Sequence, residues 1–137
     1  MLQYFKTLGI FLALFGTLQM MAQAENHKLS ISFTGLSSAK GNLMLKVSDA
    51  AGEEVLKKVV PLESQGPTVR LSLPKGNYAI AAFHDENGNK KLDRNFAGLP
   101  KEKYGFSNNV RGTFGPPALV NQLIKLAGEL EIEIRLE

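Results

Sequence analysis

The 137-residue chain contains no cysteine. Without thiols it cannot form disulfides, Fe–S clusters, cysteine zinc sites or thiol nucleophiles. It also has no cysteine to carry a lipid after export, so a lipoprotein is excluded. The fold must therefore be held together by the apolar core of a small domain.

The chain also lacks a large excess of charge of one sign. It has 16 Lys and Arg residues against 13 Asp and Glu residues, which gives a net charge of +3. Opposite charges are interspersed, as where Glu53 and Glu54 precede Lys57 and Lys58. A nucleic-acid-binding protein would be expected to show a basic stripe with interleaved aromatic residues. We therefore expect no nucleic-acid partner.

No apolar run is long enough to span a bilayer. The run Leu8–Leu18 has about half of the roughly 20 residues that a membrane-spanning helix needs. It follows a short basic segment, Met1–Lys6, and precedes the small-x-small sequence Ala22-Gln23-Ala24. This order is typical of a cleavable secretory signal peptide, and an uncleaved membrane anchor is the alternative. We expect residues 1–24 to be removed, leaving an exported, periplasmic or extracellular protein without a transmembrane segment.

After the signal segment, apolar and polar residues alternate with a period of two, the pattern of half-buried strands. The segments expected to be strands are 28–34, 43–47, 55–60, 68–73, 78–83, 123–126 and 130–136. Residues 78–83 are almost continuously apolar, which suits a central strand buried on both faces. These patterns predict an all-β domain over residues 25–137. Its architecture would be an immunoglobulin-like sandwich of about seven antiparallel strands, with a closed barrel as the alternative.

Residues 84–117 contain no convincing strand. Loops longer than roughly 12–15 residues are uncommon in compact domains and are usually functional or disordered. This segment is not disordered in composition, because it carries several large apolar residues, namely Phe96, Leu99, Tyr104, Phe106 and Phe114. We expect a structured loop with a small apolar cluster of its own.

The loop begins with a spacing that resembles a calcium-binding template. Oxygen-bearing side chains stand at relative positions 1, 3, 5 and 9, in Asp85, Asn87, Asn89 and Asp93. Calcium loops use ligands at these positions, together with a backbone carbonyl at position 7, which is Lys91 here. Alternate side chains of a tight turn converge on one centre, where a hard cation accepts their oxygens. The spacing therefore predicts a calcium site.

Two departures weaken this template. Position 6, normally glycine, is Lys90, and position 12, normally a bidentate carboxylate, is Phe96. Glu102 is the candidate for the missing carboxylate. The few carboxylates imply weak binding, with a dissociation constant of roughly 10⁻⁴–10⁻³ M. The alternative is a loop held by Asn and Asp side chains bonded to its own backbone, without a metal.

Catalytic signals are few. His84 could act as a general base or metal ligand together with Asp85 or Glu102, which would indicate a hydrolase. The alternative is a partly buried histidine that hydrogen-bonds to the backbone of the loop. The Ser107-Asn108-Asn109 block could bind a ligand or cap a turn. No Gly-x-Ser-x-Gly nucleophile elbow is present, and we assign no catalytic residue.

Several longer motifs carry a family resemblance. They are the run from Tyr78 through His84-Asp85-Glu86-Asn87-Gly88-Asn89, then Leu92-Asp93, Gly98-Leu99-Pro100, Glu102, and Tyr104-Gly-Phe-Ser-Asn-Asn109. In this order they closely resemble the bacterial family of domain of unknown function 2141. The resemblance implies exported proteins with a signal peptide and a sandwich of the transthyretin or carboxypeptidase-regulatory type. It implies no activity, because the family's function is not established.

Three hypotheses for the function follow. The first is a non-enzymatic binding or accessory module whose loop is ordered by calcium and presents residues 96–109 to a protein or glycan partner. The second is a hydrolase-type enzyme that uses His84. The third is a purely structural envelope protein without a metal.

Overall fold

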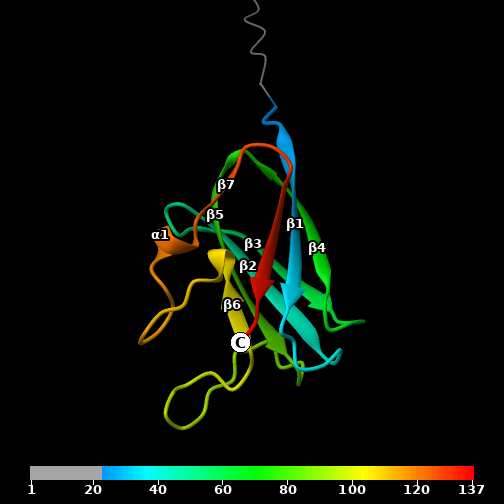
Figure 1. Cartoon of the computed structure of the whole chain (residues 1–137), viewed down its shortest axis with the longest axis vertical. Helices are drawn as coiled ribbons and strands as arrows, with labels where there is room; N and C mark the ends of the chain where they lie inside the picture. The colour runs from blue at the N-terminus through cyan, green and yellow to red at the C-terminus, as the bar shows by residue number, and fades with distance from the viewer. Residues whose placement is uncertain (1–22) are drawn as a thin grey trace, which may run out of the picture.

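The computed structural model describes residues 23–137, and the predicted signal peptide lies almost entirely outside them. The described chain forms two β-sheets that pack face to face and contain eight strands in total (Figure 1). In this part of the chain no helix is long and apolar enough to cross a membrane. The predicted all-β, two-sheet architecture is therefore confirmed.

The smaller sheet has the order β4-β1-β8. Its strands are β1 (Asn26–Thr34), β4 (Thr68–Pro74) and β8 (Leu130–Arg135). β1 pairs antiparallel with β4 and parallel with β8. The parallel pair differs from the expected antiparallel arrangement. The difference arises because a period-two pattern defines the two faces of a strand but not the direction of its neighbour.

The larger sheet has the order β3-β2-β5-β6. Its strands are β2 (Asn42–Asp49), β3 (Glu54–Pro61), β5 (Gly76–Asp85) and β6 (Tyr104–Phe106), and β7 (Ile124–Leu126) pairs with the start of β5. A short 3₁₀-helix at Ser107–Asn109 and α1 (Leu119–Gln122) complete the described elements. β6 lies inside the 84–117 segment, where the sequence predicted no strand. It has only three residues, one of them glycine, which is too short for a periodic signal.

The core lies between the sheets and is formed by the alternating residues predicted for it. Leu29, Ile31 and Phe33 of β1 face residues of β2 and β5 such as Leu43 and Ile80, and all are buried. Burial of this apolar surface is the main stabilising contribution in a chain without disulfides. The alternation along each strand therefore determines which face turns inward.

At one edge the end of the chain joins the two sheets. Beyond β8, the Leu136 amide donates to the Thr34 carbonyl, and Glu137 exchanges two backbone hydrogen bonds with Tyr104 of β6, at 3.0 and 3.2 Å. A side chain on Gly105 would collide with the Arg135 carbonyl oxygen, so only glycine permits this approach. The sandwich is thus closed on this side, partway toward the barrel considered from the sequence.

Candidate functional site at the polar loop

The polar loop, residues 85–102, begins where β5 ends and extends from one end of the sandwich (Figure 1). Asp85, the last residue of β5, has no exposed surface. One of its carboxylate oxygens accepts the Gly88 amide at 3.0 Å, and the other accepts the Lys90 amide at 2.9 Å. The buried carboxylate therefore holds the first turn of the loop.

Three polar head groups converge above this turn. The Asn87 side-chain amide donates to Asp93 at 2.6 Å, and the Asn89 amide donates to both oxygens of Asp93 at 2.9 Å. These bonds, that of Asn89 first, hold the pKa of the Asp93 carboxyl below its ordinary value. The structure thus brings together three of the residues that the sequence singled out.

The oxygens of the two asparagines cap successive turns. Asn87 Oδ1 accepts a hydrogen bond from the Asn89 backbone amide at 3.0 Å, and Asn89 Oδ1 accepts one from the Lys91 backbone amide at 2.9 Å. Between them Lys90 adopts a left-handed backbone with φ of 61°. This is the position where the calcium template has glycine, so the backbone follows the template although the side chain does not. These Asn-capped turns are also what the metal-free alternative requires, so the calcium site stays a prediction.

Glu102 lies against the same loop from its far end. Its carboxylate accepts the Asp93 amide at 3.1 Å, and the Lys101 amide donates to the Asp93 carbonyl at 2.8 Å. Burial raises the pKa of the Glu102 carboxyl. A polar hollow of about 360 Å³ lies beside these groups and is lined by Glu86, Asn87, Asp93, Arg94, Lys101 and Glu102. Nevertheless, in residues 23–137 no three His, Asp or Glu side chains are grouped closely enough to form a metal centre by themselves.

His84 is enclosed instead of facing this hollow. Its side chain is 1% exposed, and Nε2 donates to the Lys40 carbonyl at 2.7 Å. Nδ1 has no hydrogen-bond partner within the described residues and lies 3.8 Å from a Glu86 carboxylate oxygen. The described hydrogen bonds of His84 include neither Asp85 nor Glu102. The ring therefore fastens the β1–β2 connection to the end of β5.

The Ser107-Asn108-Asn109 block links three parts of the fold. Ser107 Oγ is buried and accepts the Ile80 amide at 2.9 Å. Asn108 donates to the Asn121 and Leu123 carbonyls, both at 3.0 Å, and Asn109 accepts the Arg135 amide at 2.8 Å. Both asparagines have positive φ, a conformation that Asn tolerates better than most residues. The turn-capping interpretation of this block fits the structure.

The large apolar side chains of the 84–117 segment behave in two ways. Tyr104 and Phe106 pack edge to face, with ring centroids 5.9 Å apart, as the expected cluster requires. Phe96 and Phe114 lie at loop tips and are fully exposed, with relative accessibilities of 106% and 102%, and Leu99 is 62% exposed. The loop is therefore ordered by polar bonds, while part of its apolar surface remains in solvent.

A profile for a family described as "Uncharacterized protein conserved in bacteria (DUF2141)" matches residues 31–133. The chain belongs to the DUF2141 family. The match includes the polar loop and the Ser107–Asn109 block, so the resemblance drawn from these motifs is confirmed. No curated protein and no solved structure matches the chain. The transthyretin-type relationship of this DUF2141 chain stays a prediction.

Sequence reasoning missed one surface feature, the hollowed outer face of the larger sheet. Residues 78–83 were predicted to be buried on both faces, and Ala79 is buried, but Ala81 and Phe83 are half-exposed and line an open hollow. The available signal was Met44 and Phe83, apolar residues at positions that alternate with the core residues. Such positions become informative only when the register of the sheet is known.

Proposed function

We propose that this DUF2141 protein is an exported, non-enzymatic binding module whose polar loop is ordered by a weakly bound calcium ion. The observation that carries the calcium part is the convergence of the Asn87, Asn89 and Asp93 head groups around one point. Asp93 is ionised at neutral pH and provides the negative charge at that point. The left-handed Lys90 gives the loop the turn that calcium templates use.

Calcium binding requires the loop to rearrange. The two asparagines now present amide nitrogens to Asp93, and turning their oxygens toward the ion would break the caps that these oxygens form on the Asn89 and Lys91 backbone amides. Calcium accepts such amide and carboxylate oxygens at about 2.3–2.6 Å. The carbonyl of Lys91 and the carboxylates of Asp85 and Glu102 are the further ligands of this proposal, although these carboxylates now accept backbone amides. Lys90, Lys91 and Arg94 nearby lower the affinity, which supports a millimolar site.

A binding role is favoured over hydrolysis by the position of His84. A general base must reach the proton that it removes, directly or through one water. His84 is enclosed and bonded to the Lys40 backbone, and it lines none of the three hollows described for this surface. The exposed tip residues Phe96 and Leu99, in contrast, are available to a protein or glycan partner.

Export is proposed from the N-terminal sequence alone. Mass spectrometry of the protein isolated from the cells that make it would give its N-terminus. We expect Glu25 as the first residue, and the processed protein in the periplasm or medium. An N-terminus at Met1 in the membrane fraction would indicate the uncleaved anchor.

Thermal unfolding of the processed protein in millimolar calcium and in excess EDTA tests the metal. At ten times the dissociation constant, a bound ion stabilises the folded state by about 1.4 kcal/mol. This corresponds to a shift in Tm of several degrees for a domain of this size. We expect Asp93→Asn to abolish the shift.

The matched control is Asp49→Asn, which removes a turn carboxylate that caps the Ala51 and Glu53 amides, outside the polar loop. It should lower Tm equally in both buffers and preserve the calcium shift. No shift in the wild type would remove calcium from the proposal and favour the hydrogen-bonded loop of a structural envelope protein. An equal shift in wild type and Asp93→Asn would place the ion elsewhere.

A further inference from the structure

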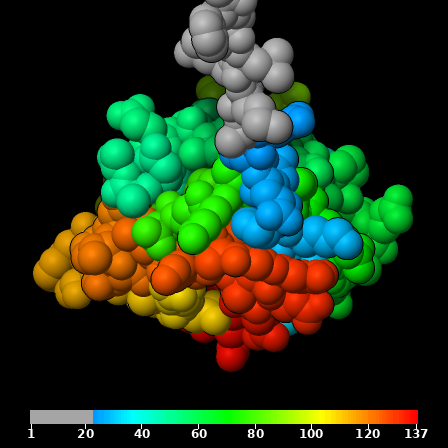
Figure 2. All heavy atoms as spheres, turned by 90° about the horizontal axis from the view of Figure 1, so that it is seen from above, coloured from blue at the N-terminus to red at the C-terminus, as the bar shows by residue number. Residues whose placement is uncertain are grey.

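The outer face of the larger sheet, turned away from the smaller sheet, is closed at both ends and open in the middle. At one end Asp85 anchors the polar loop. At the other, α1 contacts β5 and approaches the β2–β3 turn, where Leu119 lies beside Gly52. α1 and the β2–β3 turn lie side by side on one flank of the molecule (Figure 2). Ser48 and Ala79, at this end of the face, are buried.

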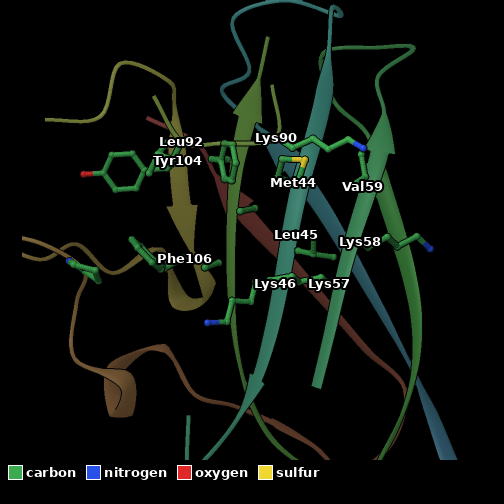
Figure 3. Close-up of a pocket in the computed structure, with 14 residues that line it drawn as sticks. Met44, Leu45, Lys46, Lys57, Lys58, Val59, Lys90, Leu92, Tyr104 and Phe106 are labelled. Atoms are coloured by element: carbon green, nitrogen blue, oxygen red, sulfur yellow. The ribbon is translucent and has the colours of Figure 1, made fainter. Parts of the chain in front are cut away.

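The open middle consists of two rows of residues in register across four strands. The first row is Val59, Met44, Phe83 and Tyr104, and the second is Lys57, Lys46, Ala81 and Phe106. Together they line a groove of about 490 Å³ (Figure 3), which is within the usual range of ligand pockets. We call it the outer groove.

The outer groove has different chemistry at its two sides. The β5–β6 side carries Phe83, Tyr104 and Phe106, and Leu92 of the polar loop joins them. This apolar surface continues into a second hollow of about 380 Å³, which shares Leu92, Tyr104 and Phe106 with the first and reaches the exposed Leu99 and Phe114. The result is an elongated, mainly apolar track from the sheet to the loop tips, with Arg94 also lining the second hollow.

The β2–β3 side carries positive charge. Lys46 and Lys57 stand directly opposite each other, and Lys90 extends from the polar loop in the direction of Val59 (Figure 3). Like charges directly opposite on neighbouring strands are destabilising. Lys57 forms an ion pair with Glu54 at 2.9 Å, but neither Lys46 nor Lys90 has an ion pair among residues 23–137.

No carboxylate lines the outer groove in the described structure. A fourth lysine of its lining, Lys58, points away from it, as does the Tyr104 hydroxyl (Figure 3). The remaining lining is mainly hydrocarbon and aromatic and offers few groups for the many hydroxyls of a neutral glycan. The charge pattern therefore selects an acidic head group, and the apolar track selects a chain.

We propose that the outer groove binds a single-chain amphiphile with an acidic head group, of the fatty-acid class. The head group would pair with the amine of Lys46 or with that of Lys90, which extend to different sides of the groove (Figure 3). The chain would cross Phe83 and Phe106 toward the second hollow. This inference names a ligand class for the proposed binding module, and it does not require the calcium ion.

The test is a calorimetric titration of the processed protein with dodecanoate, below the concentration at which it forms micelles, and with dodecanol as the uncharged match. We expect one molecule bound per chain, and dodecanoate at least about tenfold tighter, because hydrogen bonds to charged groups stabilise more than neutral ones. The double variant Lys46→Gln/Lys90→Gln should lose this preference.

The control double variant Lys28→Gln/Lys125→Gln removes the same net charge from exposed positions that do not line the groove. It should bind like the wild type. Met44→Glu, which adds a carboxylate in the middle of the groove, should weaken dodecanoate more than dodecanol, and circular dichroism would confirm that each variant is folded. Equal losses in the two double variants would overturn the proposal.

Other occupants would give other results, each of which contradicts the proposal. Binding to phosphatidylglycerol vesicles without binding of monomeric dodecanoate would make the groove a membrane contact. A dimer in sedimentation that dissociates in Met44→Glu would make it an interface between copies. The two ideas are tested separately: dodecanoate is titrated in EDTA, because calcium precipitates fatty-acid anions, and the calcium shift in Tm is measured without dodecanoate. Dodecanoate binding without a calcium shift would support the fatty-acid inference and contradict the calcium-ordered loop. A calcium shift without dodecanoate binding would support the calcium-ordered loop and contradict the fatty-acid inference.

Discussion

Along β2, successive side chains have opposite environments. Leu43, Leu45 and Val47 are buried against the smaller sheet, whereas Met44 and Lys46 line the outer groove. Both faces of the larger sheet carry apolar residues, but the smaller sheet covers only the inner one. On the outer face, coverage is confined to the ends, by α1 and by the polar loop.

This difference separates stability from binding within one sheet. The inner face is continuous with the core, so each of its side chains makes contacts that form only on folding. The outer groove is accessible to solvent in the folded protein. Truncating its apolar side chains therefore removes less buried surface and lowers the free energy of unfolding less. Changes at adjacent residues can therefore test the two roles separately.

The largest expected effect comes from Leu45→Ala, compared with Met44→Ala at the next position. Leu45 is 2% exposed and lies in the core, so its truncation should lower the free energy of unfolding by about 2–5 kcal/mol. Met44→Ala should lower it by less than about 1 kcal/mol, because solvent already reaches the side chain. Urea unfolding of both variants measures the difference. Equal losses would mean that the outer face is covered in solution, as in a dimer.

The same pair of residues shows how far the sequence could be read. Alternation predicted that Leu43, Leu45 and Val47 share a face, because side chains in a strand alternate with period two. It could not show that Met44 lies beside Phe83, since that depends on the register between distant strands. The parallel direction of β8 is missing from the prediction for the same reason, whereas the three-residue strand β6 is too short for a periodic signal.

The polar loop also combines features that could be predicted from the sequence with a contact that could not. The spacing of Asn87, Asn89 and Asp93 is local, and a tight turn brings such residues together, as the structure shows. The position of Glu102 depends on β6 returning antiparallel to β5, which places its carboxylate against the Asp93 amide. Local spacing was therefore readable from the sequence, and only the structure supplied the long-range contact.

A smaller effect is expected at the end of β5, where Asp85 anchors the loop that closes the outer face. Asp85→Asn replaces one of two buried acceptors with a donor that faces a backbone amide, at a loss of about 1–3 kcal/mol. Asp49→Asn alters a carboxylate that also accepts two backbone amides, but solvent reaches it. We expect a smaller loss there. Urea unfolding compares the two, and faster hydrogen exchange at Gly88 and Lys90 would localise the change. Equal losses would show that burial of Asp85 adds nothing.

The smallest expected effect is on the pH dependence of stability, which should come from the polar loop and not from the inner face. The folded pKa of Asp93 is lowered, chiefly by Asn89 and Asn87, so its contribution is present above the ordinary aspartate pKa of about 4. That contribution is lost as the pH falls through the lowered value. Asp93→Asn should remove this acid loss.

Glu102 should act with the opposite sign, because burial raises its folded pKa. Its contribution is present below the ordinary glutamate pKa of about 4.3 and is lost as the pH rises through the raised value. Glu102→Gln should abolish this decline, whereas Leu45→Ala should lower the whole curve without changing its shape. Urea unfolding at a series of pH values measures the curves, and NMR titration of the two carboxyls gives their pKa values. If Leu45→Ala changed the shape as much as Glu102→Gln, the pH dependence would belong to the whole fold, and the separation between the inner face and the loop would fail.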